Sequence, residues 1–139
     1  MRVPRAITIC TLVVLVSSTF ALMQIAEHQN QKVMECKNNL GVLRSALEDM
    51  KKRDGSYPAD LLEGVQRWAT HEHILDYSVR KYTRNPLDPL STEPRVTSVF
   101  DGTGGWYYAP AKGVILPNYK RVRVWICPFA FRLENPQAW

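Results

Sequence analysis

The sequence is poor in the residue types from which active sites are usually built. It has three histidines and three cysteines in 139 residues, and no two cysteines form a C-x-x-C pair. Serine, histidine and aspartate are present, but none stands in a sequence context typical of an activated nucleophile. Internal repeats and low-complexity tracts are also absent. The sequence therefore predicts neither catalysis nor a bound cofactor, and its length predicts one folded domain.

Charged residues are missing from the run 6–26, which reads AITICTLVVLVSSTFALMQIA. A helix over these residues would be about 31 Å long, close to the hydrocarbon thickness of a bilayer. Arg2 and Arg5 precede the run, and Glu27 follows it. Positive charge on the short N-terminal side predicts a single-pass inner-membrane protein with a cytoplasmic N-terminus. Its C-terminal domain is then periplasmic or extracellular.

A cleaved secretory signal is the alternative to a retained anchor. The segment Thr19-Phe20-Ala21 has the small residues of a cleavage site, and the length of the leader fits. We favour the anchor because the apolar run continues past this segment and passes into a helical pattern without a break. The expected division is therefore an anchor over 1–26 and an exported domain over 27–139.

An apolar stripe at helical spacing follows the anchor and predicts an amphipathic helix over 27–53. Lysine and arginine at 51–53 suit a last helical turn, and Asp54-Gly55 supplies a stop. The stripe is shorter than about three heptads, so packing on the chain's own sheet is favoured over a coiled coil. Its members recur at intervals of three and four residues: Val33, Cys36, Leu40, Leu43, Leu47 and Met50.

The rest of the chain predicts a loop with one short helix, then a small antiparallel sheet. In 54–95, a short helix begins near Pro58 and a loop is predicted over 69–95, where Pro86, Pro89 and Pro94 exclude a regular central strand. The sheet is expected over 96–127, with strands at 96–100, 106–109, 114–116 and 122–126, and a tail over 128–139. Trp106 and Tyr108 share one strand face and can cover the helical stripe. The fold class is therefore α+β.

Three segments carry a resemblance to the type IV pilin and type II secretion pseudopilin superfamily. LGVLRSALEDMKKRDGSYPADL at 40–61 resembles the end of the family's long helix, and RNPLDP at 84–89 resembles its P-x-DP loop. GTGGWYYAPAKGVILPN at 102–118 is similar to its GGW-x-Y hairpin and is the most specific of the three. The resemblance implies a pilin-like fold, a membrane anchor, and assembly with other pilin-like subunits through the N-terminal helix.

The N-terminus departs from the family's pattern. Prepilins of this superfamily have a leader ending in glycine, then phenylalanine, then a glutamate that neutralises a neighbouring subunit's N-terminal amine. Arg5, Ala6 and Cys10 stand at those positions here. The main hypothesis is a minor or priming subunit of a secretion or pilus-like assembly. The missing glutamate favours the alternative, a non-assembling exported binding module of the same fold that contacts DNA or an envelope partner.

Two patterns concern cysteines and metals. Cys36 and Cys127 would both lie outside the membrane, where they could form a disulfide or remain buried free thiols. The HEH segment at 71–73, with His28, has metal-ligating residue types but no third ligand with zinc spacing. Asp88 and Asp101 could offer oxygens to calcium, but the usual acidic cluster is missing. We therefore expect no metal site.

Basic and aromatic residues alternate near the end of the chain. They could clamp nucleic acid by stacking, or they could form a strand with a buried aromatic face and a solvated basic edge. The cluster is short, which favours the second interpretation. Its members are Tyr119, Lys120, Arg121, Arg123 and Trp125.

Overall fold

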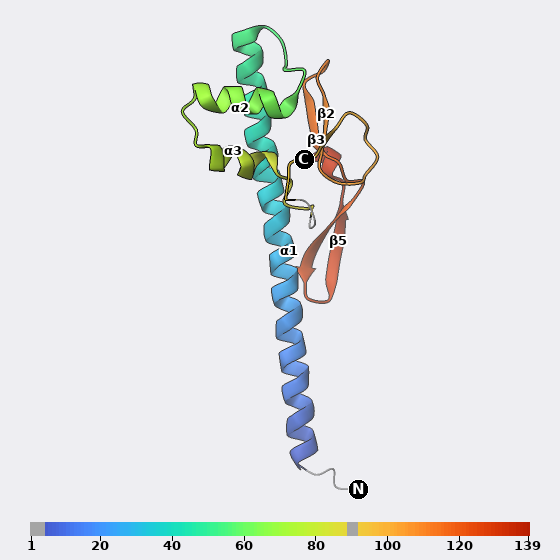
Figure 1. The fold of residues 1–139 in the computed structure, drawn as a ribbon. Helices are drawn as coiled ribbons and strands as arrows, with labels where there is room; N and C mark the ends of the chain where they lie inside the picture. The colour runs from blue at the N-terminus through green and yellow to red at the C-terminus, as the bar shows by residue number, and fades with distance from the viewer. Residues whose placement is uncertain (1–4, 89–91) are drawn as a thin grey trace.

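A helix of fifty residues, α1 (Arg5–Asp54), runs the whole length of the molecule, and the other elements pack around its C-terminal half (Figure 1). The structure is a computed structural model and describes residues 5–88 and 92–139. The apolar segment 6–26 and the amphipathic segment that follows form one continuous helix, as predicted. α1 ends one residue later than expected, where Gly55 takes a φ of 76° that few other residues adopt.

Two short helices cross α1 on one side. α2 (Leu61–His71) begins after Asp60, whose carboxylate accepts a hydrogen bond from the Glu63 amide at 2.9 Å. α3 (Asp76–Thr83) lies where a loop was expected, so that prediction was wrong. The prolines that suggested a loop all lie beyond Thr83, and the eight-residue helix buries only Val79 and Thr83.

A three-stranded sheet covers a second side of α1. Its order is β1 (Val96–Thr97), β2 (Trp106–Ala109) and β3 (Val114–Pro117). β2 and β3 form the expected antiparallel hairpin, but β1 has two residues and runs parallel to β2. The sheet is therefore mixed. The glycine-rich loop at 101–105 returns the chain to the start of β1, so β2 runs in the same direction as β1. A simple hairpin turn would instead make the two strands antiparallel.

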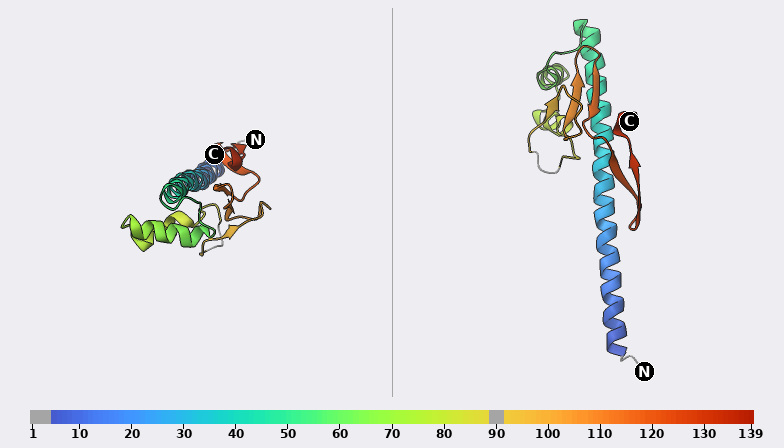
Figure 2. Two further views of the ribbon diagram at one scale, coloured as in Figure 1. Left: turned by 90° about the horizontal axis from the view of Figure 1, so that it is seen from above. Right: turned by 90° about the vertical axis from the view of Figure 1, so that its right-hand side faces the viewer.

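The last strand belongs to a separate hairpin instead of the first sheet. β4 (Val122–Cys127) pairs antiparallel with β5 (Ala130–Glu134), and a short 3-10 helix, η1 (Pro136–Ala138), follows. The segment 128–139, expected as a tail after the sheet, thus contains a strand and a short helix. Figure 2 shows this hairpin lying along α1, below the first sheet.

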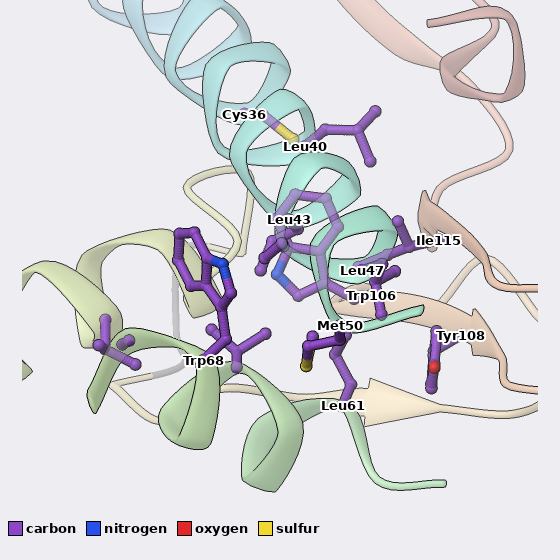
Figure 3. Packing of buried hydrophobic residues seen from close by; sticks show 14 residues of the cluster. Cys36, Leu40, Leu43, Leu47, Met50, Leu61, Trp68, Trp106, Tyr108 and Ile115 are labelled. Atoms are coloured by element: carbon purple, nitrogen blue, oxygen red, sulfur yellow. The ribbon is translucent and has the colours of Figure 1, made fainter. Parts of the chain in front are cut away.

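The core lies where α1, α2 and the first sheet meet (Figure 3). Two buried aromatic residues of β2 also fix the backbone of neighbouring segments. Trp106 Nε1 donates to the carbonyl of Thr83 at 2.7 Å, and the hydroxyl of Tyr108 donates to the carbonyl of Pro58 at 2.7 Å. All the residues expected at the helix–sheet contact are buried: Val33, Leu40, Leu43, Leu47, Met50, Trp106 and Tyr108.

Candidate functional site

The N-terminal half of α1 presents apolar side chains to the outside on every face. No side chain in 7–25 is buried by another element of the described chain, and the first buried side chain of α1 is Ala26. This helix is long and apolar enough to cross a membrane. Its large exposed residues are Ile7, Ile9, Leu12, Val13, Val14, Leu15, Val16, Phe20, Leu22, Met23 and Ile25.

The β4–β5 hairpin is the element that lies closest to this uncovered half. Asn30 of α1 makes two hydrogen bonds with the backbone of Trp125. Its Nδ2 donates to the carbonyl at 2.7 Å, and its Oδ1 accepts from the amide at 2.8 Å. Lys37 of α1 forms an ion pair with Glu134 of β5 at 2.9 Å. These contacts hold both strands of the hairpin against α1.

A groove of about 570 Å³ lies between α1 and the end of β4. Its apolar lining includes Met23, Ala26 and Met34 from the helix, with Ile126 and Cys127 from the strand. The groove therefore begins among the uncovered residues of α1 and continues upward to the region that the domain covers.

The outer face of the hairpin carries aromatic rings and a cation. Trp125 and Phe131 meet edge to face with ring centroids 5.5 Å apart. The guanidinium carbon of Arg123 lies 4.2 Å from the centroid of Phe131, a cation–π distance. Leu133, opposite Arg123 in the strand pair, is 52% exposed. This face is apolar at its centre and carries a cation beside it.

The glycine-rich loop is held by the side chain of Asn118. Its Nδ2 donates to Asp101 Oδ1 at 2.7 Å and to the carbonyl of Gly104 at 3.1 Å, and its Oδ1 accepts from the Gly102 amide at 3.0 Å. Asp101 also accepts from the amide and the hydroxyl of Thr103. These hydrogen bonds, those from Thr103 above all, lower the pKa of Asp101 to about 2. The loop is therefore a structural network.

The two candidate disulfide cysteines are not joined. Cys36 is fully buried on α1, and its thiol donates to Asn85 Oδ1 at 3.4 Å. Cys127 is exposed at the end of β4 and carries a free thiol. Burial raises the pKa of Cys36 to about 12, which makes it a poor nucleophile. The sequence left open either a disulfide or two buried free thiols. Cys36 is a buried free thiol, whereas Cys127 is free but exposed.

The candidate metal ligands do not converge. His71 contacts its neighbour Glu72 on an exposed helix end, and His28 lies on α1. Asp88 Oδ2 lies 3.6 Å from Arg95 Nη1, whereas Asp101 accepts hydrogen bonds from Thr103 and Asn118. Across residues 5–88 and 92–139, no three histidine, cysteine, aspartate or glutamate residues gather in a way that could hold a metal ion.

The basic and aromatic residues near the end of the chain lie at the start of the hairpin and on its outer face. Lys120 and Arg121 are exposed, and Arg123 stacks on Phe131. The second interpretation is therefore met only in part: the basic residues are exposed, but Trp125 is half-buried on the same outer face as Arg123 and not on a buried aromatic face. Sequence reasoning missed Asn30 and Phe131 as parts of the site. The alternation of apolar and polar residues in AFRLE at 130–134 was the available signal for β5.

Comparison with known protein families, with curated proteins and with solved structures finds no match to this chain.

Proposed function

We propose that the protein is a pilin-like structural subunit, anchored in the inner membrane by the first half of α1. It would serve as a minor or priming component of a type II secretion or type IV pilus-like assembly. The observation that carries the proposal is the uncovered apolar surface of α1 from Ile7 to Ile25, which continues without a break into the helix of the domain. A surface of this kind needs lipid, other helices, or both around it.

The places taken by two of the three resembling segments support the same proposal. The segment 40–61 joins α1 to α2, and the glycine-rich loop and hairpin at 102–118 cover the buried stripe of α1. Both segments thus help to attach the domain to the helix.

Cys10 favours the alternative function, a non-assembling exported binding module that contacts DNA or an envelope partner. Its side chain is exposed on α1, at the position where the superfamily has glutamate. A thiol at this position cannot neutralise the amine of a neighbouring subunit. Both functions require the same membrane anchor, so they differ in assembly and not in topology.

Topology is tested by adding protease to spheroplasts that express the full chain. The expected result is loss of the domain, with a protected fragment that contains the anchor. A cytoplasmic protein serves as the control for intact cells. Protection of the domain contradicts the proposal. A soluble mature form that begins near Leu22 would identify a cleaved signal instead.

Assembly is tested by chemical crosslinking in intact cells. A subunit yields a ladder of products with itself or with other pilin-like subunits, whereas the binding module yields monomers. Leu12→Ala reduces an apolar contact of α1 but leaves the segment apolar, so the ladder should weaken while membrane insertion persists. Leu75→Ala alters an exposed leucine of the domain and is the matched control. Equal ladders in both variants would argue against packing through α1.

A further inference from the structure

The β4–β5 hairpin extends toward the N-terminal end of α1 with its turn foremost (Figure 1). The contact between Asn30 and Trp125 fixes its height along the helix. Ala26, the last residue of the uncharged run, lies about 6 Å below Asn30 at 1.5 Å per residue. Cys127 lies about 7 Å beyond Trp125 in the same direction, at about 3.3 Å per residue. The turn therefore reaches the level at which the uncharged run ends.

The residues that line the groove give the position of the hairpin turn along α1 independently. Met23, three residues inside the uncharged run, lines the groove together with Cys127 and Pro128. If α1 spans a bilayer, the turn of the hairpin thus lies at the boundary between the headgroups and the hydrocarbon.

The turn has the composition expected of a segment at that boundary. The eight residues 124–131, VWICPFAF, contain no charge and are flanked by Arg123 and Arg132. Ile126 is 68% exposed and Phe129 is 73% exposed, although both are large and apolar. Tryptophan and phenylalanine between flanking arginines are typical of segments that lie in a membrane interface.

The charge of the hairpin suits anionic lipid. Lys120, Arg121, Arg123 and Arg132 stand against one acid, Glu134, which already pairs with Lys37 and Arg132. Two acidic residues of α1, Glu27 and Glu35, line the groove beside the hairpin; Glu27 is exposed and Glu35 is half-buried. The pair Cys127–Ala130 closes the turn. Arg132 lies two residues after Ala130 and Arg123 lies four residues before Cys127, so both arginines lie on the headgroup side of the turn.

We propose that the turn of the β4–β5 hairpin is a second membrane contact. Ile126 and Phe129 insert shallowly into the leaflet on the side of the domain, and Arg123 and Arg132 meet anionic headgroups. The inference rests on the proposed anchoring by α1. A second copy of the chain could reach this face only by displacing the lipid that surrounds α1 at the same height.

The cysteines of the chain supply probes for both contacts. An environment-sensitive fluorophore is attached through maleimide to Cys127 in a Cys10→Ser variant, and to Cys10 in a Cys127→Ser variant. Cys36 stays in place because it is buried, and the variant lacking both other thiols checks that it is not labelled. The full chain is reconstituted at one copy per nanodisc of phosphatidylcholine and phosphatidylglycerol containing nitroxide lipids.

The fluorophore on Cys127 should be quenched at least about twofold more by a nitroxide near the headgroups than by one deep in the acyl chain. The fluorophore on Cys10 should show the reverse order. Lys112→Cys, in the background lacking Cys10 and Cys127, is the matched aqueous control, because its turn packs near Tyr57 at the opposite end of the domain. It should be quenched by neither nitroxide.

Two substitutions test the side chains that insert. Ile126→Asp with Phe129→Asp should abolish quenching at Cys127 and leave quenching at Cys10 unchanged, since both residues are exposed and lie outside the core. Arg123→Gln should weaken the quenching at Cys127 more in discs with phosphatidylglycerol than in discs of phosphatidylcholine alone.

The outcomes separate the two proposals. Quenching at Cys10 without quenching at Cys127 overturns the hairpin contact and leaves the anchor intact. Absence of quenching at both sites overturns the anchor itself. A blue-shifted emission at Cys127 that no nitroxide quenches would show that protein covers the turn, and this result also overturns the lipid contact.

Discussion

Asp101 shows at the scale of one residue how a turn without regular structure is kept in one conformation. A single carboxylate oxygen accepts from the amide and hydroxyl of Thr103 and from the side chain of Asn118. Asn118 in turn binds the backbone of Gly102 and Gly104. The strand that carries Trp106 begins directly after this loop, so the ionised carboxylate helps to position a core residue.

Acid should therefore weaken the fold through Asp101. Its pKa is about 2 in the folded protein and about 4 in the unfolded chain. A lowered folded pKa contributes stability above pH 4 that is lost as the pH falls toward 2. Asp101→Asn should be less stable than wild type at neutral pH, and the difference should shrink across this range. Urea unfolding in detergent at several pH values measures it.

A matched control for Asp101 is Asp49→Asn. The exposed carboxyl of Asp49 has an ion pair of 4.0 Å with Lys52, one turn along α1. Such a contact contributes little to stability. A difference between wild type and Asp101→Asn that is constant with pH would contradict the proposed role of the ionised carboxylate.

The cysteines show what a residue count leaves undetermined. Two thiols beyond the apolar run are compatible with a disulfide, but the bond requires Cα atoms within about 7 Å. Along α1, Cys36 lies about 9 Å above Asn30, and Cys127 lies about 7 Å below that level. The attachment of the hairpin at Asn30 decides the matter, and nothing in the sequence near either cysteine encodes that contact.

At the scale of elements, α1 presents one covered surface and one uncovered surface. Met34 and Met50 lie on the same helix, the first 59% exposed and the second fully buried against α2. The helical spacing of the stripe was enough to assign Met50 to the core, because the spacing of apolar residues indicates which face of a helix is apolar.

Truncation of these two methionines should have unequal effects. Met50→Ala leaves a cavity between α1 and α2, so the free energy of unfolding should fall by about 2–5 kcal/mol. Met34→Ala removes an exposed side chain from the same helix and should change it by less than about 0.5 kcal/mol. Denaturant titration followed by circular dichroism in detergent compares them. Equal losses would show that the stripe is not the covered face.

Sequence patterns identified α1, α2 and the β2–β3 hairpin but not α3 or β5. The first three have strong periodicity, a proline or glycine at a boundary, or both. α3 has eight residues and buries only Val79 and Thr83, so its apolar period is too short to recognise. β5 has an exposed apolar face, and its place is set by pairing with β4 and by the Lys37–Glu134 ion pair.

At the scale of the whole molecule, the proposed assembly would depend on what α1 meets inside the membrane. The helix offers apolar surface on all sides and a thiol at Cys10. If docking between subunits requires a carboxylate that pairs with a neighbour's N-terminal amine, the wild-type chain should assemble poorly by itself. It would then act as a minor, capping or non-filamentous member.

The variant Cys10→Glu with Arg5→Gly should assemble better than wild type. If the chain is pilin-like as proposed, the glycine would restore a leader's cleavage position, cleavage would create the amine, and the glutamate would supply its partner. A carboxylate without that partner costs about 3 kcal/mol on insertion scales, so Cys10→Glu alone is the control and should not improve assembly. Electron microscopy and sedimentation of sheared cell-surface fractions measure it. Abundant filaments of the unprocessed wild-type chain would refute the argument.

α1 contains no proline, and its one glycine, Gly41, lies beyond the uncovered half. Helices without such residues bend little, so α1 behaves as a stiff rod about 75 Å long. A helix that is slightly longer than the hydrocarbon is thick accommodates the difference by tilting. A tilt of about 10° about its lower end moves the far end of such a rod sideways by about 13 Å. If α1 spans a bilayer as proposed, the thickness of that bilayer becomes a mechanical input that sets the position of the domain above it.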